Sequence, residues 1–365
     1  MSGAIRALFS WEFVGPHHLA RVRRCGERCP RIQATIFALA DKSSVYSFYE
    51  TGGDTDPNVT VAYRSVIAEE LGFWKRLRAY ARHVWFANAD AYFLCHYERP
   101  EVFLTAIILR LRMKKVFVIG DSKFDDYQRH VFREAAKAIF YLPYNGALVS
   151  GARSASYLRF LGVRGRIEVG YDTIDSRRIT KRDLSPRENV KPKSYFIVVN
   201  RLVKRKNTES VISAFAAFCK ENSAPIELLI VGEGPEGAAL RELADQLGVA
   251  DRVRFCGAIP NEQVLPLLAD ALALVLVSSS EQWGLVINEA IACGVPVIVS
   301  DAVGARDSLV RNFVNGFVVE VDNLQGLSRA MAEIWRDPGR LISPEHLSRA
   351  ATVDCFADAV DRLLT

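Results

Sequence analysis

The sequence predicts an α/β protein with two doubly wound parallel sheets, and three observations lead to this fold class. Short apolar runs, typical of strands buried on both faces, alternate with segments of helical spacing. The alternation forms two series of similar size on either side of a polar segment. At 365 residues, the chain is too long for one ordinary core. We therefore expect two Rossmann-like domains that face a cleft, the usual place for a ligand.

The first series should form an N-terminal domain over residues 1–180. It opens with an apolar run close to the N-terminus, and most later strands follow a helical segment. Strands are expected at residues 5–11, 31–39, 45–49, 91–96, 115–120, 147–150 and 166–171, and helices at 19–27, 66–82, 102–112, 124–140 and 154–161.

The second series should form a C-terminal domain over residues 193–343. It follows a polar, charged segment with two prolines, residues 177–192, which is typical of a linker. A helical tail at 344–365 is expected to pack back on the N-terminal domain. Strands of the second domain are expected at 195–199, 226–231, 252–255, 272–277, 295–300 and 316–319, and helices at 207–218, 236–247, 261–269, 285–293 and 324–334.

The charge is unevenly distributed along the chain. Residues 1–192 hold 31 Lys and Arg against 20 Asp and Glu, whereas the remainder is acidic. A basic half suits an anionic membrane surface, an anionic substrate or nucleic acid. The chain has no nucleic-acid motif and no basic run interleaved with aromatic residues, so no nucleic-acid partner is expected. Membrane contact and a merely solvated basic surface both remain open.

Cysteine usage and apolar runs indicate a cytoplasmic protein. The seven cysteines are odd in number and scattered, as expected for free thiols in a reducing compartment. The apolar run 103–119 contains four Lys and Arg residues and is shorter than the roughly 20 residues that a membrane span requires. Residues 1–10 lack the layout of a signal peptide. Docking on the inner membrane face is a further hypothesis.

One segment is the most informative. An apolar strand at 272–277 leads through a serine-rich loop into a short helix at 285–293. A helix that follows a parallel strand points its first amides at whatever lies over the carboxyl end of that strand. The sequence therefore predicts an anion site around the amides of Gly284, Leu285 and Val286.

Two carboxylates flank this predicted anion site. Glu281 lies in the loop, and Glu289 lies about one helical turn further on, roughly 6 Å along the axis from the helix start. Carboxylates repel a phosphate, but they accept hydrogen bonds strongly from hydroxyl groups. The segment therefore suits a ligand in which sugar, diphosphate and ribose follow one another. The alternative is a pair of solvated charges at a helix end, which the neighbouring motifs argue against.

Two further motifs follow strands of the second series. Arg201 and Lys206 stand five residues apart across the turn after its first strand. Two converging cations, with helix amides, would neutralise a departing diphosphate without a metal. After the next strand, residues 232–237 contain Glu233 and spell the glycine pattern of dinucleotide sites. The acidic residue that this fingerprint requires at the following strand end is missing, so the glycine turn alone indicates little.

In combination these motifs resemble the donor half of glycosyltransferase family 4. The resemblance covers about residues 195–320 and includes the cation pair, the glycine turn, Glu281-x7-Glu289, Gly294-Val-Pro-Val and Asn315-Gly-Phe-Val-Val. The Glu-x7-Glu pair is the most specific mark of that family. Its members have the GT-B fold and retain the anomeric configuration of the sugar that they transfer.

The resemblance implies a role for each motif residue. The donor would be a nucleotide-diphosphate sugar, the acceptor a glycan or a lipid-linked acceptor, and a donor phosphate oxygen would take the acceptor proton. No metal or other cofactor is implied. Arg201 and Lys206 would hold the diphosphate with the amides around Gly284, Leu285 and Val286, Glu289 would hold the ribose, Glu281 would face the sugar, and Glu233 and Gly15 would contribute to donor binding.

Three features depart from the family pattern. Asn200 stands where the family commonly has glycine. A strand of the N-terminal domain is followed by Asp121, where many members carry a histidine near the reacting sugar. Asp121 is therefore the candidate for that role, and a plain helix N-cap is the alternative. The N-terminal Gly-Gly loop is reduced to Gly15-Pro-His17-His18, and one of these histidines is a candidate contact for the acceptor.

Two smaller motifs also bear on function. Asp54-Thr55-Asp56 resembles the metal-binding triplet of the other main glycosyltransferase fold. Because it lies among turn residues without a clear strand before it, we interpret it as turn chemistry. The run that contains Tyr171 and Asp172 resembles bacterial family members that build surface polysaccharide.

Other functions remain open at this point. A sugar phosphorylase or a nucleotide-sugar epimerase would share the fold, and free phosphate as acceptor or nucleotide release without transfer would reveal them. A nicotinamide dehydrogenase is disfavoured by the missing acidic residue. A catalytically idle nucleotide-sugar-binding subunit is the non-enzymatic alternative, which the departure at Asp121 keeps open.

Overall fold

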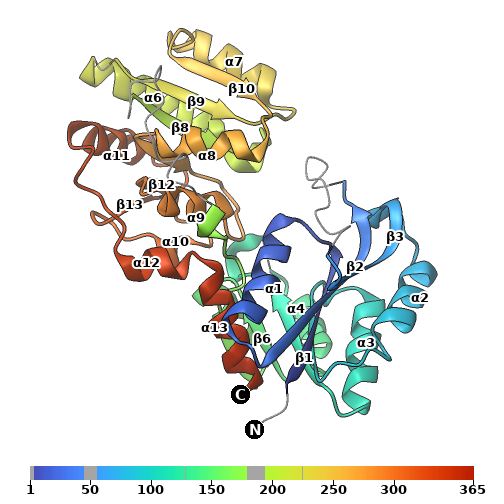
Figure 1. Cartoon of the computed structure of the whole chain (residues 1–365). Helices are drawn as coiled ribbons and strands as arrows, with labels where there is room; N and C mark the ends of the chain where they lie inside the picture. The colour runs from blue at the N-terminus through green and yellow to red at the C-terminus, as the bar shows by residue number, and fades with distance from the viewer. Residues whose placement is uncertain (1–3, 45–55, 128, 179–193, 224) are drawn as a thin grey trace. The chain divides into compact units, whose positions relative to one another are not determined.

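The computed structural model describes the chain except for its first three residues and a few internal segments (Figure 1). The described residues are 4–44, 56–127, 129–178, 194–223 and 225–365. Among them, no helix is both long and apolar enough to cross a membrane. Three expectations fall wholly or mainly outside the described residues, namely the strand at 45–49, the turn that contains Asp54-Thr55-Asp56 and the linker at 177–192.

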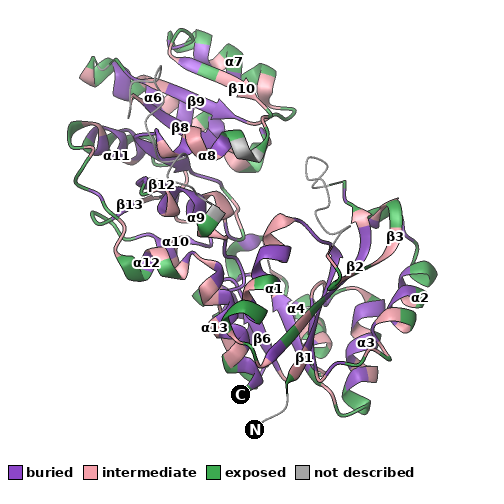
Figure 2. Ribbon diagram, in the orientation of Figure 1, coloured by how far each residue is buried: buried purple, intermediate pink, exposed green. Residues whose placement is uncertain are grey.

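The chain divides into two compact units, each with its own sheet and its own apolar cores on both faces of that sheet. Figure 2 shows that the central strands of both units are largely buried, whereas the edge strands β3 (Val59–Ile67) and β10 (Val253–Gly257) are partly exposed. The first unit comprises Met1–Phe124, Gln128–Asp175 and Thr352–Thr365, and the second comprises Asp125–Tyr127 and Ser176–Ala351.

In the described residues, the first unit contains a seven-stranded parallel sheet with the order β3-β2-β1-β4-β5-β6-β7. The chain starts in the middle of this sheet and winds outward in both directions, as in a doubly wound fold. β4 and β6 are fully buried, which explains their continuous apolar sequences. The strands are β1 (Ile5–Phe13), β2 (Ile32–Lys42), β3 (Val59–Ile67), β4 (Ala91–Leu94), β5 (Lys115–Gly120), β6 (Gly146–Val149) and β7 (Arg166–Val169).

Helices cover both faces of this sheet. One face carries α2 (Phe73–His83), α3 (Pro100–Leu111), α4 (Val131–Tyr141) and α5 (Ala152–Phe160), whose inward side chains share one core. The opposite face carries α1 (Pro16–Arg28) and the C-terminal helix α13 (Val353–Leu364).

Two expectations for the first unit are wrong. Strand β3 runs to Ile67 and so occupies the beginning of the helix expected at 66–82. β3 is an edge strand with half-exposed residues, so its apolar pattern is weak. The long helix expected at 124–140 is replaced by a 3-10 turn, Phe124–Asp126, followed by the shorter α4. Asp125 has non-helical dihedral angles and breaks the helix there.

In the described residues, the second unit contains a six-stranded parallel sheet with the order β10-β9-β8-β11-β12-β13. Two doubly wound parallel sheets confirm the predicted fold class. The strands are β8 (Tyr195–Val199), β9 (Glu227–Val231), β10 (Val253–Gly257), β11 (Ala273–Leu276), β12 (Val297–Ser300) and β13 (Gly316–Val319). The helices are α6 (Thr208–Asn222), α7 (Gly237–Gln246), α8 (Asn261–Ala269), α9 (Leu285–Ala292), α10 (Arg306–Leu309), α11 (Leu324–Arg336) and α12 (Glu345–Ala350).

The segment expected as one helical tail at 344–365 is divided between the units. α12 belongs to the second unit and α13 to the first, and the division falls after Ala351. Thr352 forms an isolated parallel bridge with Ile174, and the amide of Val353 donates to the carbonyl of Ile174 at 2.9 Å. The two places where the chain changes units are therefore joined by backbone pairing.

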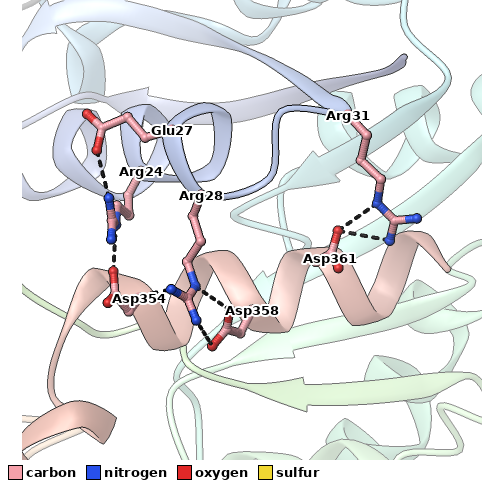
Figure 3. Close-up of polar contacts among 7 residues, drawn as sticks. All are labelled: Arg24, Glu27, Arg28, Arg31, Asp354, Asp358 and Asp361. Atoms are coloured by element: carbon pink, nitrogen blue, oxygen red, sulfur yellow. Dashed lines mark hydrogen bonds and ion pairs between the residues drawn. The ribbon is translucent and has the colours of Figure 1, made fainter. Parts of the chain in front are cut away.

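A row of ion pairs fixes α13 to α1 and its following turn (Figure 3). The three aspartates are spaced four and then three residues apart and line one face of α13. Arg24 and Arg28 lie one turn apart on α1, and Arg31 lies in the turn that follows it. The contacts join Arg24 to Asp354 at 2.5 Å, Arg28 to Asp358 at 2.5 Å and Arg31 to Asp361 at 2.9 Å. These side chains are 22% to 37% exposed, so each pair contributes at most about 1 kcal/mol.

Reversing one charge of this row tests its contribution. Asp358→Arg should lower the free energy of unfolding by roughly 1 kcal/mol, because Arg28 then faces a like charge. Adding Arg28→Asp should restore most of the loss, and urea unfolding measures both. Asp245→Arg, on the exposed side of α7, is the control for a charge reversal that breaks no such pair. A double variant no more stable than Asp358→Arg alone would show that the pairing contributes nothing.

Candidate functional site

The order of the second sheet identifies a ligand-binding position. β8 lies between β9 and β11, and the chain winds from β8 toward one edge and from β11 toward the other. The loops after β8 and β11 therefore diverge, and in open parallel sheets a ligand binds at the carboxyl ends of two such strands. These loops hold the two sets of residues that the sequence singles out, Arg201 to Lys206 and Glu281 to Glu289.

Lys206 and Glu281 meet directly at this point. The ammonium of Lys206 donates to the Oε2 atom of Glu281, and the side chains are only 13% and 12% exposed. Arg205 lies 3.8 Å from the same carboxylate oxygen. The hydroxyl of Ser278, itself buried, donates to that oxygen at 3.2 Å. The carboxylate is thus held by two cations and a hydroxyl.

Backbone contacts join the same two loops. The amide of Ser279 donates to the carbonyl of Arg205 at 2.8 Å, and the Arg205 guanidinium donates to the carbonyl of Ser280 at 3.1 Å. Sequence reasoning missed the roles of Arg205 and of the serine run. The available signal was three consecutive serines directly after a buried strand, where hydroxyl groups can orient a neighbouring carboxylate.

Helix α9 begins directly beside this ion pair. Gly284 precedes the helix with a φ of 101°, a left-handed conformation that favours glycine. A Cβ atom there would lie 2.9 Å from a side-chain carbon of Leu276. The first amides of the helix, including those of Leu285 and Val286, have no carbonyl one turn earlier to accept from them. They form the anion-binding end that the sequence predicts.

Glu289 lies one turn further along α9 and is buried. Burial raises the pKa of its carboxyl from 4.5 to about 7. At neutral pH, Glu289 therefore exists as a mixture of protonated and ionised forms. A buried acid with a pKa near neutrality is a frequent sign of a functional position.

A buried pair of side chains holds α9 against its surroundings. The indole N–H of Trp283 donates to the side-chain oxygen of Asn288 at 2.9 Å. The Asn288 amide in turn donates to the carbonyl of Ala351 at 3.0 Å. Both residues are buried, so the contacts fix the orientation of the helix on which Glu289 lies. Sequence reasoning gave neither residue a role, and no spacing pattern marks them.

The glycine turn packs against the turn after β8. A Cβ atom on Gly232 would lie 1.8 Å from the carbonyl oxygen of Asn200, and one on Gly234 would lie 2.2 Å from that of Leu202. The amide of Leu202 also donates to the carbonyl of Glu233 at 2.9 Å. Gly232 and Gly234 are therefore required for the close approach of two backbone segments. Arg201 lies between Asn200 and Leu202, the two residues that the glycine turn contacts.

Arg201 and Glu233 are both exposed on these adjoining turns. The structure thus places Arg201, Lys206, Glu281, Glu289 and the first turn of α9 in one unit, and brings Lys206 and Glu281 into contact. Gly15 and Asp121 belong to the first unit.

Gly15 lies at the end of β1 and begins α1. Its amide donates to the Nδ1 atom of His18 at 3.1 Å, so His18 acts as an acceptor at the helix start. Burial lowers the pKa of His18, which keeps this acceptor neutral. The His18 ring also packs 4.8 Å from that of Trp11. The structure gives His18 a local role that the sequence did not anticipate.

Asp121 directly follows β5 at the carboxyl edge of the first sheet. Its carbonyl accepts from the hydroxyl of Ser154 in α5 at 3.0 Å. The N-cap position of α4 is His130, so the alternative in which Asp121 caps that helix is wrong. Asp121 thus remains placed at a strand end, as the family resemblance requires.

The Tyr171-Asp172 motif connects α1 to the sheet. The Tyr171 hydroxyl accepts from the indole of Trp11 at 3.0 Å, and Asp172 accepts from Ser150 at 2.6 Å. Arg21 donates to Asp172 at 3.2 Å and lies over the Tyr171 ring. These side chains are buried. The motif therefore stabilises the start of α1, next to the Gly15 loop.

Only one residue of the Asp54-Thr55-Asp56 triplet is described. Asp56 accepts from the amide of Asn58 at 2.9 Å and from Arg23 at 2.8 Å, which is turn chemistry. Asp54 and Thr55 lie outside the described residues. Within the described part of the chain, no group of three or more His, Cys, Asp or Glu side chains is arranged to hold a metal ion.

A family model described as "Glycosyl transferases group 1" matches residues 181–354. The matched segment contains Lys206, Glu281 and Glu289, the residues gathered at the ends of β8 and β11. Residues 181–354 form a group 1 glycosyltransferase domain. The match confirms the group 1 glycosyltransferase assignment that the sequence motifs predict.

Curated relatives match about half of this chain. An N-acetyl-alpha-D-glucosaminyl L-malate synthase of Bacillus anthracis is 33% identical over 47% of this chain and 45% of its own length. The lipopolysaccharide core biosynthesis glycosyltransferase LpsE of Rhizobium meliloti is 30% identical over 48% of this chain and 50% of its own. The matched part of the chain thus spans about half the length of these relatives.

Solved structures match the whole chain at low identity. A sucrose-phosphate synthase of Thermosynechococcus elongatus has a TM-score of 0.71 at 20% identity and covers 99% of this chain and 98% of its own. Anabaena Alr3699/HepE in complex with UDP and glucose has a TM-score of 0.71 at 18% identity and covers 99% of both chains. These likenesses show that the group 1 domain lies within a GT-B fold.

The raised pKa of Glu289 predicts a pH dependence of stability. The folded protein binds this proton more tightly than the unfolded chain does, because folding buries the carboxyl. The contribution of neutral Glu289 is therefore complete below about pH 4.5 and is lost as the pH rises through about 7, by roughly 3 kcal/mol at most. Glu289→Gln, which stays neutral, should flatten this decline in urea unfolding between pH 5 and 8. If the free energy of unfolding fell equally with pH in both proteins, the raised pKa of Glu289 would be contradicted.

Proposed function

We propose that the protein is a retaining glycosyltransferase that transfers a sugar from a nucleotide-diphosphate sugar to a glycan or a lipid-linked acceptor. The observation that carries this proposal is the Lys206–Glu281 contact beside the N-terminus of α9, at the strand ends of a group 1 glycosyltransferase domain. The arrangement presents cations and helix amides to a diphosphate, with carboxylates on either side for hydroxyl groups.

The proposed donor lies across the carboxyl ends of β8 and β11. Lys206, Arg201 and the amides of Leu285 and Val286 bind the diphosphate, whose two charges they neutralise. Glu281 accepts from hydroxyl groups of the sugar, and its contact with Lys206 orients both groups before the donor binds. Glu289 accepts from ribose hydroxyls in its ionised form. Glu233, on the exposed turn after β9, contributes at the edge of this site.

The transfer breaks the bond between the anomeric carbon and the diphosphate oxygen, and the bonding electrons leave with the diphosphate. The acceptor hydroxyl forms its new bond on the same face, which retains the anomeric configuration. Its proton passes to an oxygen of the leaving phosphate. Lys206 and Arg201 stabilise the charge that develops on the leaving group, so the step requires no metal.

Asp121 and the Gly15 loop are the proposed contributions of the first unit. Asp121 directly follows β5. Its carboxylate accepts a hydrogen bond from a hydroxyl of the donor sugar, in the place where many family members have a histidine. The Gly15 loop, stabilised by Trp11, His18 and Tyr171, lies at the end of β1. Both positions are at the carboxyl edge of a parallel sheet, where substrates bind.

The comparisons support the substrate classes. HepE holds UDP and glucose, which supports a nucleotide-sugar donor for a chain of the same fold. LpsE is named for lipopolysaccharide core biosynthesis, which supports a glycan acceptor attached to lipid. A cytoplasmic location at the inner membrane face, with an anionic lipid surface as partner, fits such an acceptor and the basic first half of the chain.

Assays with defined substrates separate the remaining alternatives. Incubation with a panel of nucleotide sugars and an acceptor glycan should yield a glycosylated product with retained configuration. A sugar phosphorylase would instead release sugar 1-phosphate from a glycan with free phosphate. A donor-binding subunit without catalysis would bind nucleotide sugar but neither transfer nor hydrolyse it.

Removing the Lys206 ammonium should impair catalysis more than folding. Lys206→Ala should lower kcat/KM about 100-fold, because an electrostatic contact with the leaving group is lost. Lys204→Ala, at a highly exposed lysine two residues earlier, is the matched control and should stay near wild type. Thermal unfolding recorded alongside distinguishes the two effects. Equal losses of activity and stability in Lys206→Ala would indicate a structural role.

Activity should not depend on an added divalent metal. The proposed site supplies its positive charge from Lys206, Arg201 and helix amides, so turnover after treatment with EDTA should remain within about twofold of the untreated enzyme. The rate of product formation measures this directly. Complete loss with EDTA and recovery with Mg²⁺ would reject the proposed leaving-group stabilisation.

A further inference from the structure

Helix α2 of the first unit exposes an unusual set of side chains. Its inward face contributes Ala79 and Tyr80 to the core. Its outward face presents Trp74, Lys75, Arg78 and Arg82, all exposed, and the exposed Phe86 follows the helix. We call these five residues the α2 stripe. Figure 2 shows the exposed residues of α2 on the outer surface of the first unit.

The spacing of the stripe follows the helix. Trp74, Arg78 and Arg82 are separated by four residues each, so they lie in one row along about 12 Å of helix. Trp74 is 77% exposed and Phe86 is 73% exposed. Two large aromatic side chains thus project into solvent at the two ends of a row of cations. Isolated exposed apolar residues are common, whereas these two flank a row of cations.

The stripe and the neighbouring α3–β5 segment are basic, although the exposed Glu69 and Glu70 lie just before α2. Residues 71–89 contain four Lys and Arg and no Asp or Glu, and residues 102–120, which form α3 and β5, contain four more and again no acid. α3 packs beside α2, where Trp85 donates to Thr105 at 2.9 Å. At the end of α3, Arg112 lies over the ring of Phe86. The neighbouring helix therefore extends the basic surface.

We propose that the α2 stripe docks the protein on a lipid bilayer that contains anionic lipids. Lys75, Arg78 and Arg82 contact the lipid phosphates, while Trp74 and Phe86 enter the boundary between headgroups and acyl chains. Aromatic rings prefer this boundary, and long basic side chains reach from it to the charged headgroups. A protein partner is disfavoured because the row lacks the buried apolar centre of a stable protein interface.

The docking surface rests in part on the proposed function, since a lipid-linked acceptor requires access to a membrane. The α2 stripe is the segment that would provide this access. The nearby packing also makes α2 a rigid support, because Arg76, buried beneath the stripe, pairs with Glu12 and lies 3.5 Å from Glu101. The exposed side chains therefore project from a helix that is fixed to the sheet.

Vesicle sedimentation tests the proposal. The full chain should bind vesicles of equal parts phosphatidylcholine and phosphatidylglycerol at low salt, and should bind pure phosphatidylcholine vesicles weakly. The triple variant Lys75→Ala, Arg78→Ala and Arg82→Ala should weaken binding to the anionic vesicles about 100-fold, since each cation near a lipid surface strengthens binding about fivefold. The matched control replaces three exposed cations of the second unit, in Lys220→Ala, Arg254→Ala and Arg329→Ala, and should bind as wild type.

Tryptophan fluorescence locates the contact. Of the five tryptophans, Trp74 is the exposed one, whereas Trp11 and Trp283 are buried and Trp85 and Trp335 are half-buried. Brominated lipids in the anionic vesicles should therefore quench Trp74, and Trp74→Phe should remove this quenching. Phe313→Ala, at an exposed aromatic residue of the second unit, should leave it unchanged.

Two results would overturn the proposal. One is the absence of wild-type binding to anionic vesicles at low salt. The other is equal binding by wild type and the triple variant, with far-ultraviolet circular dichroism showing that both are folded. The vesicles carry no donor, and nucleotide-sugar binding is measured separately by calorimetry. Failure of the docking surface is therefore distinguishable from failure of the proposed glycosyltransferase activity.

Discussion

The contact between the Lys206 ammonium and the Glu281 carboxylate is the interaction on which the candidate site depends. The two residues are 75 positions apart in sequence, and they meet because β8 and β11 are neighbours in a parallel sheet whose chain winds away from them in opposite directions. Both side chains are largely buried, and Arg205 and Ser278 also contact the Glu281 carboxylate, so this carboxylate is held in one orientation by several partners. A site for an anionic ligand thus exists before the ligand binds, and little reorganisation is needed when it does.

Backbone packing keeps this site in place. Gly232 and Gly234 allow the loop after β9 to lie against the turn that contains Arg201. Gly304 plays the same part on the other side, since its amide donates to the carbonyl of Glu281 and a Cβ atom there would lie 1.7 Å from the carbonyl of Gln282. The glycines therefore act by allowing neighbouring loops to pack closely. The side chains at the site, and not these glycines, are the groups that would bind charged and hydroxyl groups of a ligand.

Much of this arrangement could be predicted from the sequence, because it rests on local signals in order along the chain. The alternation of apolar runs and helical segments predicted both sheets, and the Glu-x7-Glu spacing predicted the family. The burial of Glu289 and the hydrogen bonds of Trp283 and Asn288 could not be predicted, since they depend on tertiary packing around α9. The sequence did not reveal edge strand β3, because its half-exposed residues give only a weak alternation of apolar and polar positions. The Arg24, Arg28 and Arg31 spacing recurs in three aspartates 330 residues later, a signal that was present but not used.

The most direct test of the account is the proton balance of donor binding. A nucleotide-diphosphate sugar has no phosphate monoester that titrates near neutrality. A proton released to the buffer when the donor binds therefore comes from a group of the protein. Glu289, with a pKa of about 7, should become fully ionised when ribose hydroxyls donate to it. Calorimetry at pH 7 in buffers of different ionisation enthalpy should show release of about half a proton per bound donor by wild type and none by Glu289→Gln. Failure of every nucleotide sugar to bind, or equal proton release by both proteins, would contradict the account.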